Sequence, residues 1–199
     1  MSLVDLIGQA DDRGLTASGL ACLDRCVPLL GGDDEVLRPL WGSLTEGSGG
    51  DWSESLEQVR GKLATPEESE GNEAALLAHR MLAAAPAGRT TAEVRQWADA
   101  CSVASLQIHR ILDPVEDASP DDALDRIRAG EAPAEGCLVS VPPLVAAELR
   151  RQISVLELLA EHGAGGLRPA LDVSTEGRRV LRAVVSRRAR GAQGARARS

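Results

Sequence analysis

The sequence predicts an all-α protein, and three observations lead to this fold class. Apolar residues recur at helical spacing along most of the chain, and the region 91–112 is the clearest example. The chain has no Phe or Tyr and only three Trp in 199 residues, whereas β-sandwiches and barrels depend on aromatic and β-branched side chains. Its one strand-like run, 137–141, cannot form a sheet alone, and the strand–helix alternation of parallel-sheet folds is absent. We therefore expect a bundle, or stacked helical hairpins, of eight or nine helices.

Caps and glycine breaks place the helices of the N-terminal part. Ser2 is a good N-cap, and Gly14 and the Gly31-Gly32 pair are good stop signals. Asp33 or Asp34 can cap a third helix, and Asp51 a fourth after the EGSGG loop at 46–50. The expected helices cover 3–13 and 16–30, a stretch that ends at Leu44, and 51–63.

The C-terminal part shows five more helices by the same criteria. Thr90 and Glu93 have the spacing of a capping box, Asp113-Pro114 stops the helix that follows, and Ser119-Pro120 begins another. The expected ranges are 74–85, 91–112, 120–129, 143–162 and 174–190. We expect two helical parts, 1–63 and 72–190, or one continuous domain. The basic C-terminal end, 191–199, is expected to be disordered.

Charge is distributed unevenly along the chain. Residues 178–199 contain eight Arg and no acid, whereas residues 1–177 contain 14 basic and 30 acidic residues and carry a net charge of −16. Arg178, Arg179 and Arg182 would either cover an acidic surface of the same protein or belong to a basic arm that binds nucleic acid or an acidic partner. Both interpretations fit the sequence.

The sequence carries no recognisable signal peptide and no run of 18 apolar residues. We therefore expect a cytoplasmic protein with no membrane segment and with reduced thiols. Cys22 and Cys26 are four residues apart, but no CxxC or HxxxH pair accompanies them or Cys101 and Cys137. We interpret the four cysteines as buried structural thiols.

Catalytic motifs are equally sparse. Asp121, Asp122 and Asp125 form a DDxxD string, a spacing that holds Mg²⁺ and diphosphate in helical prenyl-transferring enzymes. Here the string follows a helix start, where acids complement the helix dipole. His79, His109 and His162 each stand alone in their helices, and no phosphate-binding loop or nucleophile elbow occurs. The sequence therefore predicts no catalytic, cofactor-binding or metal residue, and an enzyme without a recognisable motif remains an alternative.

The segment RQWADACSVASLQIHRIL, 95–112, resembles the helix-turn-helix of phage repressors and Cro, with flanking helices that extend the resemblance to 74–129. Ala98, Ser102 and Ile108 occupy that family's small, turn and aliphatic positions, although Ser102 replaces the usual glycine. The resemblance implies a DNA-binding regulator that uses residues 91–112. The side chains that it assigns to DNA contact are Gln107, His109 and Arg110 on the exposed edge of the recognition helix, with Ser105 near the start of that helix. A plain long helix in a bundle explains the same apolar stripe.

The favoured functional prediction is a non-enzymatic cytosolic adaptor or regulator that acts through protein contacts, without a cofactor. The strongest candidate surface is the helix at 143–162, which has more apolar surface than one buried face requires. This surplus would close a homodimer or be packed inside a large bundle. The residues of its main stripe are Leu144, Leu149, Ile153, Leu156 and Leu159.

Overall fold

A computed structural model describes residues 1–45, 50–63, 71–113, 123–131 and 141–196. In these ranges the chain forms nine α-helices and no strand, which confirms the all-α prediction and the expected number of helices. Nearly all of the strand-like run 137–141 lies outside the described residues. The helices are α1 (Leu3–Gln9), α2 (Asp12–Cys26), α3 (Arg38–Thr45), α4 (Gly50–Lys62), α5 (Glu73–Ala83), α6 (Thr91–Leu112), α7 (Ala123–Arg128), α8 (Pro143–His162) and α9 (Leu167–Arg196).

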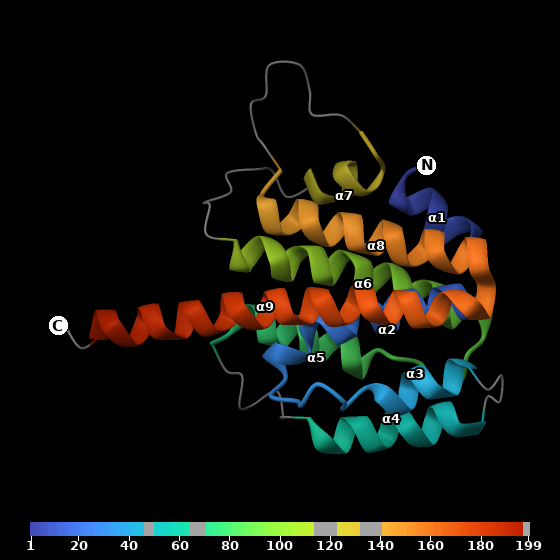
Figure 1. Cartoon of the computed structure of the whole chain (residues 1–199), viewed down its shortest axis with the longest axis horizontal. Helices are drawn as coiled ribbons and strands as arrows, with labels where there is room; N and C mark the ends of the chain where they lie inside the picture. The colour runs from blue at the N-terminus through green and yellow to red at the C-terminus, as the bar shows by residue number, and fades with distance from the viewer. Residues whose placement is uncertain (46–49, 64–70, 114–122, 132–140, 197–199) are drawn as a thin grey trace.

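The long helices lie side by side, as Figure 1 shows, with the α3–α4 pair at one side of the bundle and α1 and α7 at the other. Helix α2 is the central element, because every residue from Gly14 to Cys26 is buried. It packs against α6, α8 and α9. Small residues such as Ala17, Gly19 and Ala21 let neighbouring helices approach from several sides, which suits a helix without a solvent-exposed face.

The N-caps predicted at Ser2 and Thr90 are present, whereas the caps predicted at Asp33 or Asp34 and at Asp51 are wrong, because α3 begins only at Arg38 and α4 already begins at Gly50. The Ser2–Asp5 and Thr90–Glu93 capping boxes begin α1 and α6, each with both reciprocal hydrogen bonds. The predicted helix over 3–13 is wrong, however, because Asp11 caps a new helix there. Its carboxylate accepts the Gly14 N–H at 2.7 Å, so α1 ends at Gln9 and α2 begins at Asp12.

The last helix is much longer than predicted. Helix α9 begins at Leu167, directly after the 3-10 turn Gly163–Gly166, and continues to Arg196. Residues 191–196, part of the end that we expect to be disordered, continue α9 as a helix, and 197–199 lie outside the described residues. Arginines near the C-terminal end of a helix complement its dipole, which favours a long helix in this basic segment.

One hydrophobic core joins the two predicted parts of the chain. The largest buried cluster contains Leu20 and Trp52 from 1–63 together with Ile108 and Leu181 from 72–190. The polar linker between the parts, 65–72, lies almost entirely outside the described residues. Among the described helices, none combines the length and hydropathy that a membrane-spanning segment requires.

Two tryptophans organise the centre of this core. The indole N–H of Trp97 donates to the Met81 carbonyl at 2.9 Å, and that of Trp52 donates to the Pro86 carbonyl at 2.7 Å. Their rings meet edge to face, with centroids 6.1 Å apart. Because Gly19 has no side chain, α2 can lie against the Trp97 ring: a Cβ at that position would come within 2.7 Å of two ring carbons.

Candidate functional site

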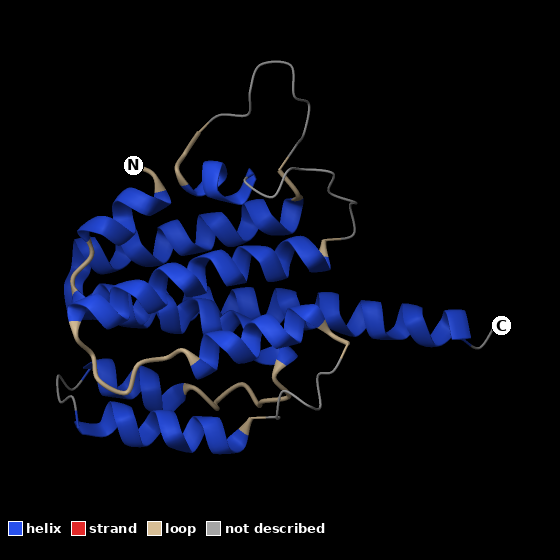
Figure 2. Cartoon of the chain, turned by 180° about the vertical axis from the view of Figure 1, so that it is seen from behind, coloured by secondary structure: helices blue, strands red, loops and turns tan. Residues whose placement is uncertain are grey.

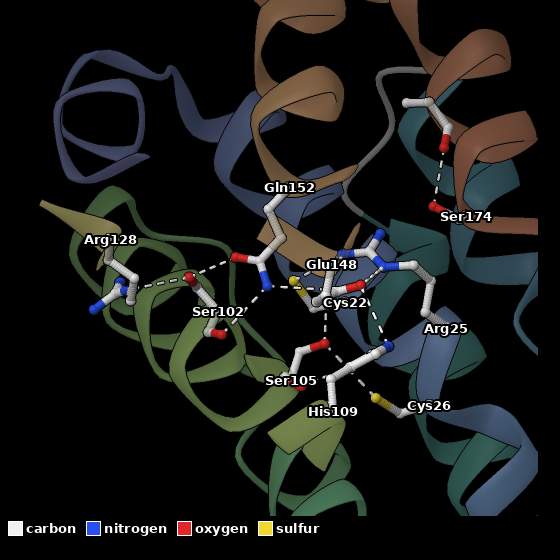
Figure 3. Close-up of polar contacts among 11 residues, drawn as sticks. Cys22, Arg25, Cys26, Ser102, Ser105, His109, Arg128, Glu148, Gln152 and Ser174 are labelled. Atoms are coloured by element: carbon white, nitrogen blue, oxygen red, sulfur yellow. Dashed lines mark hydrogen bonds and ion pairs between the residues drawn. The ribbon is translucent and has the colours of Figure 1, made fainter. Parts of the chain in front are cut away.

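Polar side chains from four helices meet in the interior of the bundle, where Figure 3 shows them. They come from α2, α6, α7 and α8, and we call this set the Glu148 cluster. Its members are Cys22, Arg25, Cys26, Ser102, Ser105, His109, Arg128, Glu148 and Gln152. All of them are buried. Buried polar groups require hydrogen-bonding partners, so their partners define what the cluster can do.

The centre of the cluster is an ion pair between Arg25 and Glu148, both with fully buried side chains. The guanidinium binds the carboxylate through two hydrogen bonds, Nε to Oε2 at 2.8 Å and Nη2 to Oε1 at 2.7 Å. Oε1 also accepts the Ser105 hydroxyl at 2.7 Å and the Gln152 amide at 2.9 Å. Burial alone raises the pKa of Glu148, but Arg25, His109 and these donors outweigh it and lower the pKa to about 2.

His109 lies beside this pair. Its Nδ1 is 2.7 Å from the Ser105 carbonyl oxygen, which only accepts, so Nδ1 carries the proton. Its Nε2 is 3.6 Å from Glu148 Oε2. Burial lowers the pKa of His109 more than the nearby Glu148 carboxylate raises it. The ring is therefore neutral at pH 7.

The cluster reaches the surface on the side of α7. Ser102 Oγ donates to Gln152 Oε1 at 2.6 Å and accepts from Arg128 Nε at 3.1 Å. Arg128 is itself buried, and it forms an ion pair with the exposed carboxylate of Asp99. This chain of contacts ties α7 and α8 to α6.

The cysteines next to the cluster are buried thiols, as predicted for Cys22, Cys26 and Cys101. Burial raises the pKa of Cys22 to about 12, and it raises those of Cys26 and Cys101 as well. Thiols that hold their proton are weak nucleophiles and weak metal ligands. No group of three described His, Cys, Asp or Glu side chains is arranged to hold a metal ion. Cys137 lies outside the described residues.

The Glu148 cluster contains a hydroxyl, an imidazole and a carboxylate, but they are not connected as a nucleophile and its base. Ser105 donates its hydroxyl proton to Glu148, and the free nitrogen of His109 faces the same carboxylate. A nucleophilic serine needs its hydroxyl to donate to the base instead. No member of the cluster lines any of the described cavities. The arrangement supports a structural role in which buried charges join helices.

A second buried ion pair adjoins the first. Asp24, the residue before Arg25, is fully buried; it binds Arg178 Nη1 at 2.5 Å and accepts the Trp41 indole N–H at 3.3 Å. Burial raises the pKa of Asp24 to about 6, against the opposing effect of Arg178. Helix α2 is thus held to α8 through its arginine and to α9 through its aspartate.

Some of the basic residues at the start of the segment 178–199 form ion pairs with acidic residues of the same chain. Arg178 Nε lies 3.4 Å from Asp34, and Arg182 Nη2 lies 2.6 Å from the same carboxylate. The interpretation that these two residues cover acidic groups of the same protein is confirmed. Arg179 instead lies 3.9 Å from Glu176 of its own helix.

The residues predicted to contact DNA are divided between the interior and the surface. Helix α6 runs without interruption from Thr91 to Leu112, so no turn forms at Ser102. The prediction that Ser105 and His109 are available to DNA is wrong, because both are buried and are held by the Glu148 cluster. Gln107 is exposed and Arg110 is half-buried.

The predicted partner face on α8 is used mainly within the bundle. Leu156 and Leu159 are buried, so the prediction that they are available to a partner is wrong. The other three residues of the stripe, Leu144, Leu149 and Ile153, are half-buried and pack against core clusters. Helix α8 contacts α1 and α6 as well as α2 and α9, which explains why its apolar surface exceeds one face.

Sequence reasoning missed Glu148 and Gln152, although a signal for them exists. They are four residues apart and share one side of a helix whose neighbouring residues are apolar, which indicates a polar pair inside a core.

In the DDxxD string, Asp125 lies 3.8 Å from Arg128 of its own helix, and Asp121 and Asp122 lie outside the described residues.

The end of α9 extends away from the rest of the bundle. We define residues 187–196 as the α9 arm, and Figures 1 and 2 show it projecting beyond the other helices. Its last recorded contact with the bundle is the hydrogen bond from Arg188 to the Asp113 carbonyl at 3.5 Å. Arg187, Arg188 and Arg190 are exposed.

Comparison of the chain with family models, curated proteins and solved structures found no match.

The pKa of Glu148 predicts a specific loss of stability in acid. In the unfolded chain this carboxyl titrates near its ordinary pKa of 4.5, but in the folded chain it titrates at about 2. The pair therefore stabilises the fold fully above pH 4.5, and the stabilisation is lost as the pH falls toward 2. We expect the difference in unfolding free energy between wild type and Glu148→Gln to shrink by about 3 kcal/mol over this window.

Urea denaturation of both proteins between pH 6 and pH 2 measures this difference. His109 also destabilises the fold as the pH falls below 6.5, whereas Asp24, with a raised pKa, has the opposite effect below about pH 6. Asp24 is unchanged in both proteins, whereas Glu148→Gln also removes the carboxylate that raises the pKa of His109, so the Glu148 effect is judged from the part of the curves below pH 4.5. Parallel curves would contradict the assignment.

Proposed function

We propose that this chain is a non-enzymatic cytoplasmic adaptor or regulatory protein that acts through protein contacts, and that the α9 arm is its contact surface for an acidic partner. One observation carries the proposal. Three exposed arginines lie on a helix end that projects from the bundle, in a segment, 178–199, without an acidic residue. Clustered guanidinium groups bind carboxylates strongly and with defined geometry.

The interior of the molecule supports a binding role rather than catalysis. The titratable groups of the Glu148 cluster are buried and paired with one another, away from the described cavities. The ion pair between Asp24 and Arg178 attaches the middle of α9, ahead of the arm, to α2. A rigid base allows a projecting helix to present its charges at a fixed angle, which lowers the entropic cost of binding.

An acidic protein is a better partner for the arm than nucleic acid. The rest of the chain, residues 1–177, carries a net charge of −16 and would repel a long polyanion that extended past the arm. The arm also has no aromatic side chain on which bases could stack. An acidic protein surface of limited size can bind the arm without approaching the acidic bundle.

Anisotropy of a fluorescent acidic peptide, such as a short oligo-glutamate, tests the proposal at low and physiological salt. We expect saturable binding that is weakened at least about tenfold when Arg187, Arg188 and Arg190 are all changed to Gln, because charge-assisted contacts are lost. The matched control changes three exposed arginines of the bundle, Arg80, Arg150 and Arg168, to Gln. It removes the same charge and should bind like wild type.

Two results would overturn the proposal. Equal weakening in the arm variant and the control variant would mean that the peptide senses only net charge. Tighter binding to a random DNA duplex than to the peptide at physiological salt, lost in the arm variant, would replace the protein partner with nucleic acid.

A further inference from the structure

The largest described cavity is lined by the start of α2 and by the loop that precedes α6. Figure 1 shows that both helices begin at the end of the bundle opposite the α9 arm. Its volume is about 420 Å³, within the range of small-molecule sites. The first turn of α2 and the loop 87–89 form its walls, and Leu44 of α3 adds an apolar side. Apart from Arg13 and Arg89, its lining residues are Asp12, Thr16, Leu44, Ala87 and Gly88.

The walls of this cavity are held in place by hydrogen bonds. The Trp52 indole N–H binds the Pro86 carbonyl at 2.7 Å and so fixes the start of the loop that forms one wall. The guanidinium of Arg89 stacks over the same indole ring, 5.7 Å from its centroid. On the other wall, the Thr16 hydroxyl donates to the Asp12 carbonyl at 2.6 Å. The cavity therefore exists without a ligand to shape it.

The charges in the cavity are not balanced. Arg13 and Arg89 are half-buried, and neither forms an ion pair within the described part of the chain. Two acids at the adjacent helix starts are engaged as caps: Asp11 accepts the Gly14 N–H, and Glu93 accepts from Thr90. Asp12 is the one carboxylate that lines the cavity, so its described walls carry a net charge of +1.

We propose that this cavity binds a small molecule that carries an oxyanion, either a carboxylate or a phosphate, on a short aliphatic body. The two guanidinium groups would bind the oxyanion, since half-buried arginines without a counter-ion favour an anionic ligand. Leu44 and Ala87 would contact the aliphatic part. The site is separate from the α9 arm and does not depend on the function proposed for it.

The tryptophans provide a direct readout. None of the three tryptophans lines the cavity itself, but Trp52 lies directly beneath Arg89 of its wall. Titration with succinate, and separately with inorganic phosphate, is followed by the indole N–H signals in a ¹H–¹⁵N NMR spectrum. Succinate tests a carboxylate ligand and phosphate tests a phosphate ligand. We expect at least one of them to shift the Trp52 signal saturably, with a Kd of about 1 mM or below, and to leave Trp41 and Trp97 unchanged.

Variants separate the site from general charge effects. Arg13→Gln combined with Arg89→Gln should weaken binding at least about tenfold. The control, Arg80→Gln with Arg150→Gln, removes the same charge elsewhere, and it should bind like wild type, as should the α9 arm variant. Circular dichroism checks that each variant is folded. The absence of a saturable Trp52 shift with both anions, or unchanged binding in the Arg13 and Arg89 variant, would overturn the proposal.

Discussion

Replacing Glu148 with Ala is expected to lower the free energy of unfolding by about 3–5 kcal/mol, because it leaves the Arg25 guanidinium charged and buried without a counter-ion. The same change removes the acceptor of the Ser105 hydroxyl and of the Gln152 amide. Each donor left unpaired in the interior adds a further cost of about 1–3 kcal/mol if no water reaches it. A loss of this size approaches the total stability of many domains.

Denaturant titration at pH 7 measures the effect. Glu157→Ala is the matched control: it removes a carboxylate from the same helix at an exposed position, and we expect a change within about 0.5 kcal/mol. If the Ala variant does not fold, Glu148→Gln keeps the shape and should show a smaller loss in the same direction. A change below about 1 kcal/mol in both Glu148 variants would contradict the role given to the cluster.

Changing Arg25 as well as Glu148 separates two costs: the cost of leaving the Arg25 charge unpaired and the cost of losing the hydrogen bonds to the Glu148 carboxylate. When both residues are replaced by Met, neither member of this pair is left as an unpaired buried charge, and the double variant should be more stable than Glu148→Ala. The recovery of stability should be incomplete, because Ser105 and Gln152 still lack the carboxylate that accepts their hydrogen bonds. Strictly additive losses would show that the two side chains do not act as a pair.

Trp97→Ala is expected to cost about 3–5 kcal/mol, which is typical of removing a large aromatic side chain from a core. Trp97 is 3% exposed and packs in the largest hydrophobic cluster. Its loss leaves a cavity next to Gly19, removes the edge-to-face contact with Trp52, and leaves the Met81 carbonyl without the indole donor. Thermal and urea denaturation measure the cost.

The packing of Trp97 against α2 can also be tested by a substitution in α2. Gly19→Ala should destabilise the fold by about 1–3 kcal/mol, because the added methyl group comes within 2.7 Å of the ring. Gly42→Ala is the control, since nothing lies within 4 Å of the new methyl group in α3. That change should raise stability by up to about 1 kcal/mol, because Ala is the better helix former. Two changes of the same sign would contradict the packing described here.

The sequence determined the class of the fold and most of the helix starts, because these depend on local interactions. A capping box such as Thr90 and Glu93 is formed by residues three apart, so its chemistry can be recognised without knowledge of the rest of the molecule. Helical spacing likewise predicted the apolar stripe of α6 but left open whether the helix is continuous, which the structure shows it to be. The sequence did not reveal the helix boundary at Asp11, because α1 and α2 are separated by only two residues and their apolar residues follow a similar helical spacing.

The tertiary structure alone decided which polar residues are internal. Arg25 and Glu148 are 123 residues apart, and Asp24 and Arg178 are 154 apart, so no local pattern pairs them. The resemblance to a helix-turn-helix assigned Ser105 and His109 to the recognition helix as residues that would contact DNA. They are buried because α8 brings a carboxylate to them. A buried polar group is stable only when its partner is present, and packing of the helices is what supplies that partner.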